Sequence, residues 1–399
     1  MSDRFIEELP FFDDEHVRLS RSVANFAAHE VEPRAAGEEE GDAGEHLREL
    51  LRLLAQADLL QYSVAAETAA VGAGGQSLDA RSLCLVRESL SYSSALADLA
   101  FVMQGLGTYP VALAAPEHLR EFWLTRARAG RAVAAFALTE PEAGSDVASI
   151  QTNARREGDG YVINGHKCFI SNAGVADFYT IFARTGTSPD GRAELSAFVV
   201  GARMPGLRVS ERTRLIAPHP VGEVVFENLR VPLQDRLGEE GDGFRLAMQT
   251  MDMFRASVGA AACGMARRAL DEALRYAKNR KQFGRPLAEH QLIQSKLALM
   301  QTELDAARLL VYRAAYVKDG GAGAAVGRGH LTRTASEAKL FATEAAWRII
   351  DEAVQIHGGN GVRHGSVVER LLRDVRALRI YEGTSEIQKL IIAGQLLRE

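Results

Sequence analysis

The sequence predicts an α+β fold in which an antiparallel β domain lies between two all-helical domains. Apolar residues recur at helical spacing through the first third of the chain, short apolar runs of strand length fill the middle, and long apolar stripes return in the last part. We therefore expect an N-terminal all-helical domain at 1–131, a β barrel or sandwich domain at 132–236, and an antiparallel four-helix-bundle domain at 237–399.

The first domain is assigned from residues 13–131. Val17, Val23, Phe26 and Ala27 recur at mostly helical spacing, and the leucines of 47–54 repeat at intervals of three and four. The pattern predicts helices joined by short loops, with internal boundaries that the sequence defines only loosely.

The middle domain begins where the helical spacing gives way to short apolar runs. These runs lie at 132–139, 161–163, 167–171, 178–183, 195–200 and 221–226. Asn164-Gly165 between two of them is typical of a two-residue hairpin turn, so we expect separate strands before and after it. The alternation predicts an antiparallel barrel or sandwich that ends near Pro232.

The last domain is assigned from three stripes of apolar residues spaced three or four apart. They begin near Ala247, Met300 and Ala338. Such stripes predict long helices packed as an antiparallel bundle.

Composition narrows the classes of function. The chain has 399 residues, a formal net charge of -5 and three cysteines, Cys84, Cys168 and Cys263, without metal-ligand spacing. A nucleic-acid-binding surface, a disulfide framework and a metal site are not indicated. The acidic first residues are not typical of a targeting segment and no unbroken apolar run is long enough to cross a bilayer, so we expect a cytoplasmic protein without membrane insertion.

The stretch 379–388, Arg-Ile-Tyr-Glu-Gly-Thr-Ser-Glu-Ile-Gln, holds the strongest catalytic candidate, Glu382. Gly383 frees the backbone beside this carboxylate, and Thr384 with Glu386 is typical of a helix start whose unpaired N–H groups attract an anion. A solvated glutamate in a capping loop is an equally good interpretation of these residues alone.

Three further motifs occur before this stretch, Thr-Glu-Pro-Glu-Ala-Gly-Ser-Asp at 139–146, Arg-Lys-Gln-Phe-Gly at 280–284 and Gln-Ile-His-Gly-Gly-Asn-Gly at 355–361. In this order the four motifs resemble the flavin-dependent acyl-CoA dehydrogenase family, and the resemblance covers most of the chain. Each motif alone has a simpler interpretation: a turn, a basic helix end and a helix C-cap.

The resemblance implies a role for each matching residue. Glu382 is implied as the catalytic base. FAD contacts are implied for Thr139, Ser145, Phe169, Ser171, Arg280, Gln282, Phe283, Gln355, Gly358, Gly359, Thr384 and Glu386, of which Arg280, Gln282 and Phe283 serve the cofactor of a neighbouring subunit. Substrate contacts are implied for Ser145, Asp252, Arg255 and Gly383. From spacing alone, Asp252 and Arg255 predict only an ion pair within one helix.

Two departures from the family pattern mark a divergent member. Phe169 and Ser171 replace the family's Trp and Thr on a strand that packs against the flavin, although Phe169 also suits an ordinary core strand. The segment 215–222, Leu-Ile-Ala-Pro-His-Pro-Val-Gly, replaces a Gly-x-Arg-x-Ser-x-Thr pattern. Its His219 is expected to be an exposed loop histidine, with a general base as the alternative.

The activity implied by the resemblance is FAD-dependent α,β-dehydrogenation of an acyl thioester to a trans-2-enoyl product. An electron-transfer flavoprotein is the implied electron acceptor, and a homotetramer, a dimer of dimers, is the implied assembly. Alternatives are a dehydrogenase for acyl-carrier-protein-bound substrates, a flavin monooxygenase on the same scaffold and a non-catalytic thioester-binding protein. An intact Tyr-Glu-Gly-Thr argues against the last two, because neither needs a base at Glu382.

Overall fold

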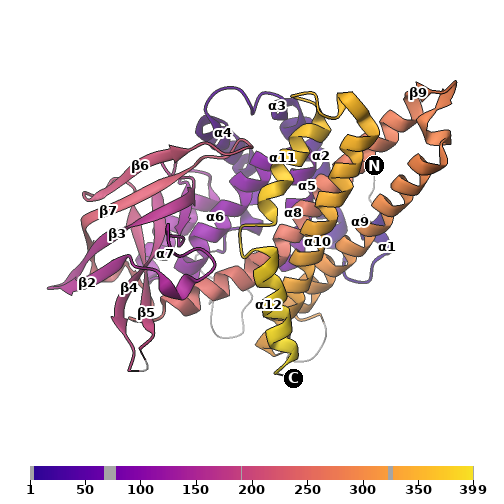
Figure 1. Ribbon diagram of the computed structural model, residues 1–399. Coiled ribbons are helices and arrows are strands. Elements are labelled where there is room, and N and C mark those ends of the chain that lie inside the picture. Colours follow the sequence, from indigo (N-terminus) through magenta and orange to yellow (C-terminus); the bar gives the residue numbers. More distant parts are fainter. Residues whose placement is uncertain (1–3, 67–77, 190, 322–326, 399) are drawn as a thin grey trace. The chain divides into compact units, whose positions relative to one another are not determined.

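A computed structural model describes residues 4–66, 78–189, 191–321 and 327–398. These residues form two compact units. Unit 1 comprises Met1–Gly37, Ala80–Asp98 and Asp252–Glu399, and unit 2 comprises Glu38–Asp79 and Leu99–Met251. Helical segments before and after a central mixed sheet confirm the predicted fold class (Figure 1).

Unit 1 is helical. Its elements are α1 (Arg4–Glu8), α2 (Asp14–Phe26), a π-helical turn (Ala27–Val31), α3 (Glu32–Ala35), α5 (Ala80–Ser93), the main part of α8 (Gly243–Asn279), the short strands β9 (Lys281–Gln282) and β10 (Arg285–Pro286), α9 (Gln291–Lys318), α10 (Arg328–His357), α11 (Val367–Leu378) and α12 (Ser385–Leu396). Short 3-10 turns at Leu287–Glu289 and Gly358–Asn360 connect some of them.

The long helices of unit 1 pack through alanine-rich faces. Ala260, Ala261 and Ala262 of α8 are fully buried, as are Ala338, Ala342 and Ala345 of α10. A Cβ added to Gly259 would lie 2.7 Å from a methyl of Val311 on α9, so only glycine permits this close approach of two helices. The predicted three- and four-residue stripes are therefore the buried faces of the bundle.

Unit 2 contains the sheet together with α-helices and short 3-10 turns. Its elements are α4 (Ala43–Gln56), a 3-10 turn (Leu59–Tyr62), most of α6 (Ala95–Ala114), α7 (Glu117–Arg128), β1 (Ala134–Ala137), a 3-10 turn (Val147–Ser149), β2 (Asn153–Glu157), β3 (Gly160–Ser171), β4 (Phe178–Thr187), β5 (Ala193–Gly201), β6 (Leu207–Thr213), β7 (Val221–Pro232), a 3-10 turn (Leu233–Asp235) and β8 (Arg236–Leu237).

The sheet is mostly antiparallel and is not closed into a barrel. Its strand order is β6-β7-β3-β2-β4-β5-β8, with β1 paired in parallel to β4. A core of Ile163, Tyr179, Phe198, Phe226 and other apolar side chains covers one face of it. Figure 1 shows these strands gathered into a single twisted sheet.

The hairpin predicted at Asn164-Gly165 is wrong. β3 runs unbroken through these residues, and the tight turn lies earlier, where Glu157 pairs with Gly160. Gly165 instead marks an irregularity opposite β7, and a Cβ there would lie 2.3 Å from Thr152 Oγ1. The glycine is needed for close approach of two backbones rather than for a turn.

Within the part of the chain that the structure describes, one helix is long and apolar enough by composition to cross a membrane. It is α6, and 89% of its apolar window is buried in the structure, as in the core helix of a soluble protein. Polar residues interrupt the apolar sequence of α6, so the absence of a long unbroken apolar run did not reveal it. Length and composition alone make weak support for a membrane span.

Candidate active site

Glu382 lies in the loop between α11 and α12, in a backbone conformation that few residues other than glycine adopt. Its φ is 53°, and that of the following Gly383 is 90°. Thr384 then caps α12 by accepting a hydrogen bond from the N–H of Ile387 at 3.3 Å, as the sequence predicts. Two consecutive residues are therefore left-handed, and such backbone strain is common at functional sites.

Two buried side chains hold this loop by its carbonyl groups. Lys339 Nζ on α10 donates to the Gly383 carbonyl at 2.7 Å, and Gln388 Nε2 on α12 donates to the same oxygen at 2.9 Å and to the Glu382 carbonyl at 3.2 Å. Both side chains are fully buried. The loop conformation is therefore fixed from two helices.

The Glu382 carboxylate is half-buried, and its Oε2 is buried with no hydrogen-bond partner among the described residues. Burial raises the pKa of Glu382, and the nearby cations Arg87, Lys339 and Arg255 oppose this rise. A carboxylate with an unpaired oxygen and an environment that tunes its pKa is suited to accept a proton.

The sequence analysis did not single out Arg87, Lys339 or Asp98. Arg87 on α5 is fully buried and donates to both carboxylate oxygens of Asp98, at 2.8 and 2.7 Å, and to Ser257 Oγ at 2.9 Å. Burial lowers the pKa of Lys339 to about 8. The sequence does carry an indication of such residues, namely a charged residue within an otherwise apolar helical stretch, as in Leu-Val-Arg-Glu at 85–88.

Asp252 and Arg255 form the ion pair that their spacing predicts. Arg255 Nη1 lies 3.1 Å from Asp252 Oδ1, and Arg255 is only 5% exposed. The positive charge of Arg255 also lowers the pKa of Glu382. The structure therefore brings Arg255 and Glu382, two of the predicted site residues, together in unit 1.

Six of the FAD contacts predicted in unit 1 lie at one end of two helices. Tyr276 near the end of α8 stacks on His357 near the end of α10 at 4.3 Å, and Asn360 donates to the Tyr276 hydroxyl at 3.2 Å. The segment with Arg280, Gln282 and Phe283 follows the first helix, and Gly358 and Gly359 follow the second. Gln355, one turn before Gly358, is exposed.

This end of the bundle leaves an aromatic side chain and two glycines uncovered. Phe283 is 94% exposed and has a φ of 53°. A Cβ at Gly358 or Gly359 would meet no atom within 4 Å, so an approaching ligand would find open space beside the backbone. These features fit the flat, phosphate-bearing half of a dinucleotide.

Four further predicted residues lie in unit 2, whereas Glu386 lies in the first turn of α12 in unit 1. Thr139 and Ser145 belong to the loop after β1, and Phe169 and Ser171 end β3. The Thr139 carbonyl accepts the Cys168 N–H at 3.0 Å, so the loop and the strand end are joined.

A buried ion pair fixes this loop to β3. Lys167 Nζ lies 2.8 Å from Glu140 Oε1 and donates to the Leu138 carbonyl at 2.9 Å, and Lys167 is fully buried. Glu140 also accepts the N–H of Thr152 at 3.0 Å. These contacts join the loop that carries Thr139 and Glu140 to β3.

Phe169 is not the ordinary core residue that the alternative interpretation allows. It is 64% exposed with a φ of 54°, whereas Cys168 and Ile170 on either side are buried. The register of β3 against β7 shifts between Lys167 and Ile170, and this irregularity turns the ring outward. An uncovered aromatic ring on a rigid strand suits a flat ring system such as isoalloxazine.

His219 is not the exposed loop histidine that the sequence favours. Its side chain is half-buried, and Nε2 lies 2.9 Å from Ser171 Oγ. The two prolines beside it predicted a stiff loop, but only the tertiary structure shows the serine that the imidazole contacts.

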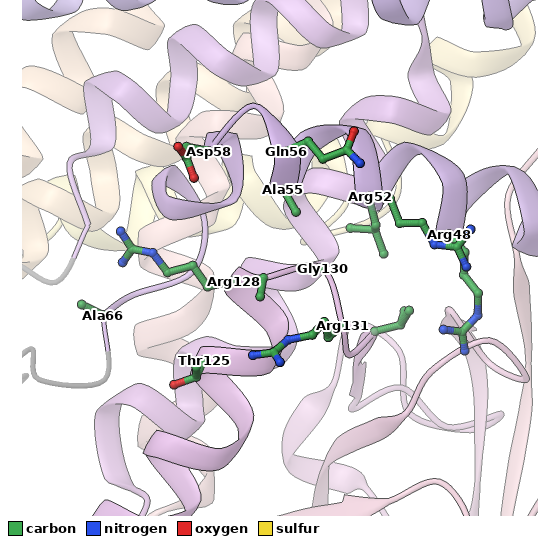
Figure 2. Close-up of a pocket in the computed structure, with 13 residues that line it drawn as sticks. Arg48, Arg52, Ala55, Gln56, Asp58, Ala66, Thr125, Arg128, Gly130 and Arg131 are labelled. Atoms are coloured by element: carbon green, nitrogen blue, oxygen red, sulfur yellow. The ribbon is translucent and has the colours of Figure 1, made fainter.

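A pocket in unit 2 lies away from these residues. It has a volume of about 910 Å³ and is lined by α4, α7 and the segment before β1, with Arg48, Arg52, Arg128 and Arg131 among its residues (Figure 2). None of the predicted site residues lines it. Among the described residues no cluster of three or more His, Cys, Asp or Glu side chains could hold a metal ion.

Comparison with known proteins agrees with the motifs. The chain matches the acyl-CoA dehydrogenase N-terminal domain over residues 13–131, the middle domain over 135–229 and the C-terminal domain over 241–397.

Two relatives and one solved structure illustrate the similarity. The chain is 39% identical over 393 residues to a 3-(aryl)acrylate reductase of Clostridium sporogenes, covering 97% of this chain and 100% of the relative. It is 38% identical over 392 residues to cyclohexane-1-carbonyl-CoA dehydrogenase of Geobacter metallireducens, covering 98% and 99%. A glutaryl-CoA dehydrogenase of Mycobacterium smegmatis in complex with FADH2 superimposes with a TM-score of 0.86 at 26% identity, covering 98% of this chain and 96% of that one.

These matches confirm the predicted family, enzyme class and cofactor. The chain belongs to the acyl-CoA dehydrogenase family, whose members are FAD-dependent oxidoreductases that act on acyl-CoA.

Proposed function

We propose that this protein dehydrogenates the α,β bond of an acyl thioester and that Glu382 is its catalytic base. The observation that supports this most directly is the Glu382 carboxylate itself, which has a buried oxygen without a partner among the described residues and a loop fixed by Lys339 and Gln388. A capping glutamate exposed to solvent would have neither property.

The reaction removes two hydrogens from adjacent carbons. Glu382 takes the α hydrogen as a proton, the pair of electrons left on the α carbon forms the new double bond, and the β hydrogen leaves as hydride. FAD, when bound, supplies the hydride acceptor. Glu382 must be ionised before this step and neutral after it.

The surrounding charges serve this cycle. A desolvated carboxylate is a stronger base, and burial raises the pKa of Glu382 in that sense. Arg87, Lys339 and Arg255 limit this rise in the pKa of Glu382. The paired Asp98 keeps Arg87 in place without cancelling its effect on Glu382 entirely.

The residues present also suit FAD. The exposed ring of Phe169 and the hydroxyl groups of Thr139 and Ser171 would contact the isoalloxazine, with Ser145 beside them. Arg280, Gln282, Phe283, Gln355, Gly358 and Gly359 would hold the adenosine diphosphate of a neighbouring subunit, and Thr384 and Glu386 would lie beside the cofactor at the start of α12. This shared site requires at least a dimer, because each cofactor needs two subunits, and the assembly we propose is a homotetramer built as a dimer of dimers.

The experiment that tests the proposal compares Glu382→Gln with the matched control Glu117→Gln, which changes an exposed glutamate on α7. Both variants should purify yellow with FAD. Under anaerobic conditions, flavin bleaching by an acyl-CoA panel should slow by about a hundred- to ten-thousandfold in Glu382→Gln, the usual contribution of a general base, and stay unchanged in the control.

Retained reduction within about tenfold of wild type would exclude Glu382 as the base, given that range. Colourless wild-type protein that stays free of FAD after incubation with it would refute the cofactor site. Bleaching by acyl-carrier-protein thioesters but not by CoA thioesters would identify the carrier-bound substrate instead.

The opposite direction is the second candidate, because the relative that is 39% identical is a 3-(aryl)acrylate reductase. The same geometry serves both directions, with protonated Glu382 returning its proton to the α carbon. Reoxidation of reduced enzyme by an aryl-acrylyl thioester, compared with its reoxidation by an electron-transfer flavoprotein, would distinguish a reductase from a dehydrogenase that donates electrons to that partner. A cytoplasmic location is part of the proposal and is tested by cell fractionation.

A further inference from the structure

The loop between β6 and β7 is built to hold His219 against the end of β3. Pro218 and Pro220 flank the histidine and restrict its backbone. The Asn172 N–H donates to the Pro220 carbonyl at 2.7 Å, and Ser171 pairs with Val221 in the sheet. The loop is therefore anchored on both sides of the point where the imidazole contacts Ser171.

The contact is a hydrogen bond between two neutral groups. His219 Nε2 lies 2.9 Å from Ser171 Oγ. Burial lowers the pKa of His219 to about 4, so the imidazole is uncharged at physiological pH. A neutral imidazole offers one donor and one acceptor nitrogen, and either can engage a hydroxyl. No carboxylate bonds to His219 among the described residues, which gives no support to its alternative role as a general base.

The partner of the histidine is a serine at a position where the family pattern has threonine. Threonine is restricted at χ1 because its Cβ carries two heavy atoms, whereas serine rotates among three staggered positions more freely. A serine hydroxyl that must face a ligand therefore needs another restraint. In this chain the only side chain recorded in hydrogen-bond contact with Ser171, among the described residues, is His219.

We propose that His219 is a positioning residue that holds the Ser171 hydroxyl toward the edge of the bound flavin, a restraint that a β-branched residue would provide by itself. This inference rests on the proposed flavin site. The two departures from the family pattern then belong together, because His219 of the Pro-His-Pro loop supplies the restraint that is lost when serine replaces threonine. Phe169, two residues earlier and 64% exposed, would supply the adjoining ring wall.

The test is a mutant cycle with the dissociation constant of FAD and the visible spectrum of bound flavin as readouts. His219→Ala should weaken FAD binding by about 3- to 10-fold, the value of one hydrogen bond, and shift the flavin absorbance band. Ser171→Ala should weaken binding at least as much, and the double alanine variant should be no worse than Ser171→Ala, because His219 acts only through the Ser171 hydroxyl.

Rescue distinguishes positioning from general damage to the loop. Adding Ser171→Thr to His219→Ala should restore affinity and spectrum to within about twofold of wild type, because threonine is restrained without the imidazole. His219→Gln, whose amide can still bond to the hydroxyl, should also stay near wild type. His166→Ala is the matched control. His166 lies on β3, the strand of Ser171, and its imidazole is 2.8 Å from Glu223, so its replacement should leave flavin binding and the flavin spectrum unchanged.

The outcomes separate this inference from the proposed function. Wild-type protein that fails to bind FAD refutes the proposed function. Wild-type protein that binds FAD, together with a His219→Ala variant unchanged in affinity and spectrum, refutes only the role of His219. Loss of binding in His219→Ala that neither Ser171→Thr nor His219→Gln repairs would also overturn it, because the loop would then matter for its packing alone.

Discussion

Gly383→Ala should damage both the stability of the protein and the placement of Glu382. Gly383 has a φ of 90°, and a left-handed backbone costs a non-glycine residue about 1–2 kcal/mol. The added Cβ would lie 2.5 Å from Gln388 Nε2, which must then move away from the two carbonyl groups it bonds. Leaving a buried amide without its acceptors costs about 1–3 kcal/mol.

Together these effects amount to about 2–5 kcal/mol, and they act on the loop that carries the proposed base. The melting temperature should fall by at least about 4 °C, since 1 kcal/mol corresponds to roughly 2–4 °C for a unit of about this size. Displacement of the carboxylate by about 1 Å should slow flavin reduction by about a hundredfold.

The assay pairs thermal unfolding with stopped-flow bleaching of flavin by acyl-CoA. Gly394→Ala is the matched control on the adjoining helix α12, because its added Cβ meets nothing within 4 Å. That control should keep its rate and melt at or slightly above the wild-type temperature, as alanine favours helix more than glycine does. A Gly383→Ala variant with wild-type melting temperature and rate would refute the argument that this glycine is required.

Three further predictions follow from named contacts. Lys339→Met removes a cation that lowers the pKa of Glu382, so the pKa of Glu382 should rise. The rate of flavin reduction at pH 6, relative to the rate at pH 8, should then be lower than in wild type. Equal pH profiles for the two proteins would contradict this. Lys167→Met leaves the buried Glu140 carboxylate without its cation and should cost about 3–5 kcal/mol, seen as a lower melting temperature. Arg280→Ala should lower FAD affinity while light scattering still gives a tetramer, and a wild-type monomer that holds FAD tightly would refute the shared site.

The sequence alone determined the fold class and the order of its parts. Apolar spacing of three or four residues identified the helices of the bundle, because a buried helix face repeats with the turn of the helix itself. The motif around Glu382 and its family resemblance predicted a base and identified the cofactor, since motifs are local in sequence. The Asp252–Arg255 ion pair was also predictable, because both residues lie on one helix three positions apart.

Only the tertiary structure decided what surrounds these residues. Asn164-Gly165 has the composition of a turn, yet it lies inside β3. The glycine is required there because Thr152 on a neighbouring segment leaves no room for a side chain. Arg87 and Lys339 lie about 295 and 43 residues before Glu382 in the chain and approach it only when α5 and α10 pack. His219 and Ser171 are separated by 48 positions and meet through a pairing of β3 with β7. Local spacing carries no information about such contacts, because they depend on which strands and helices become neighbours.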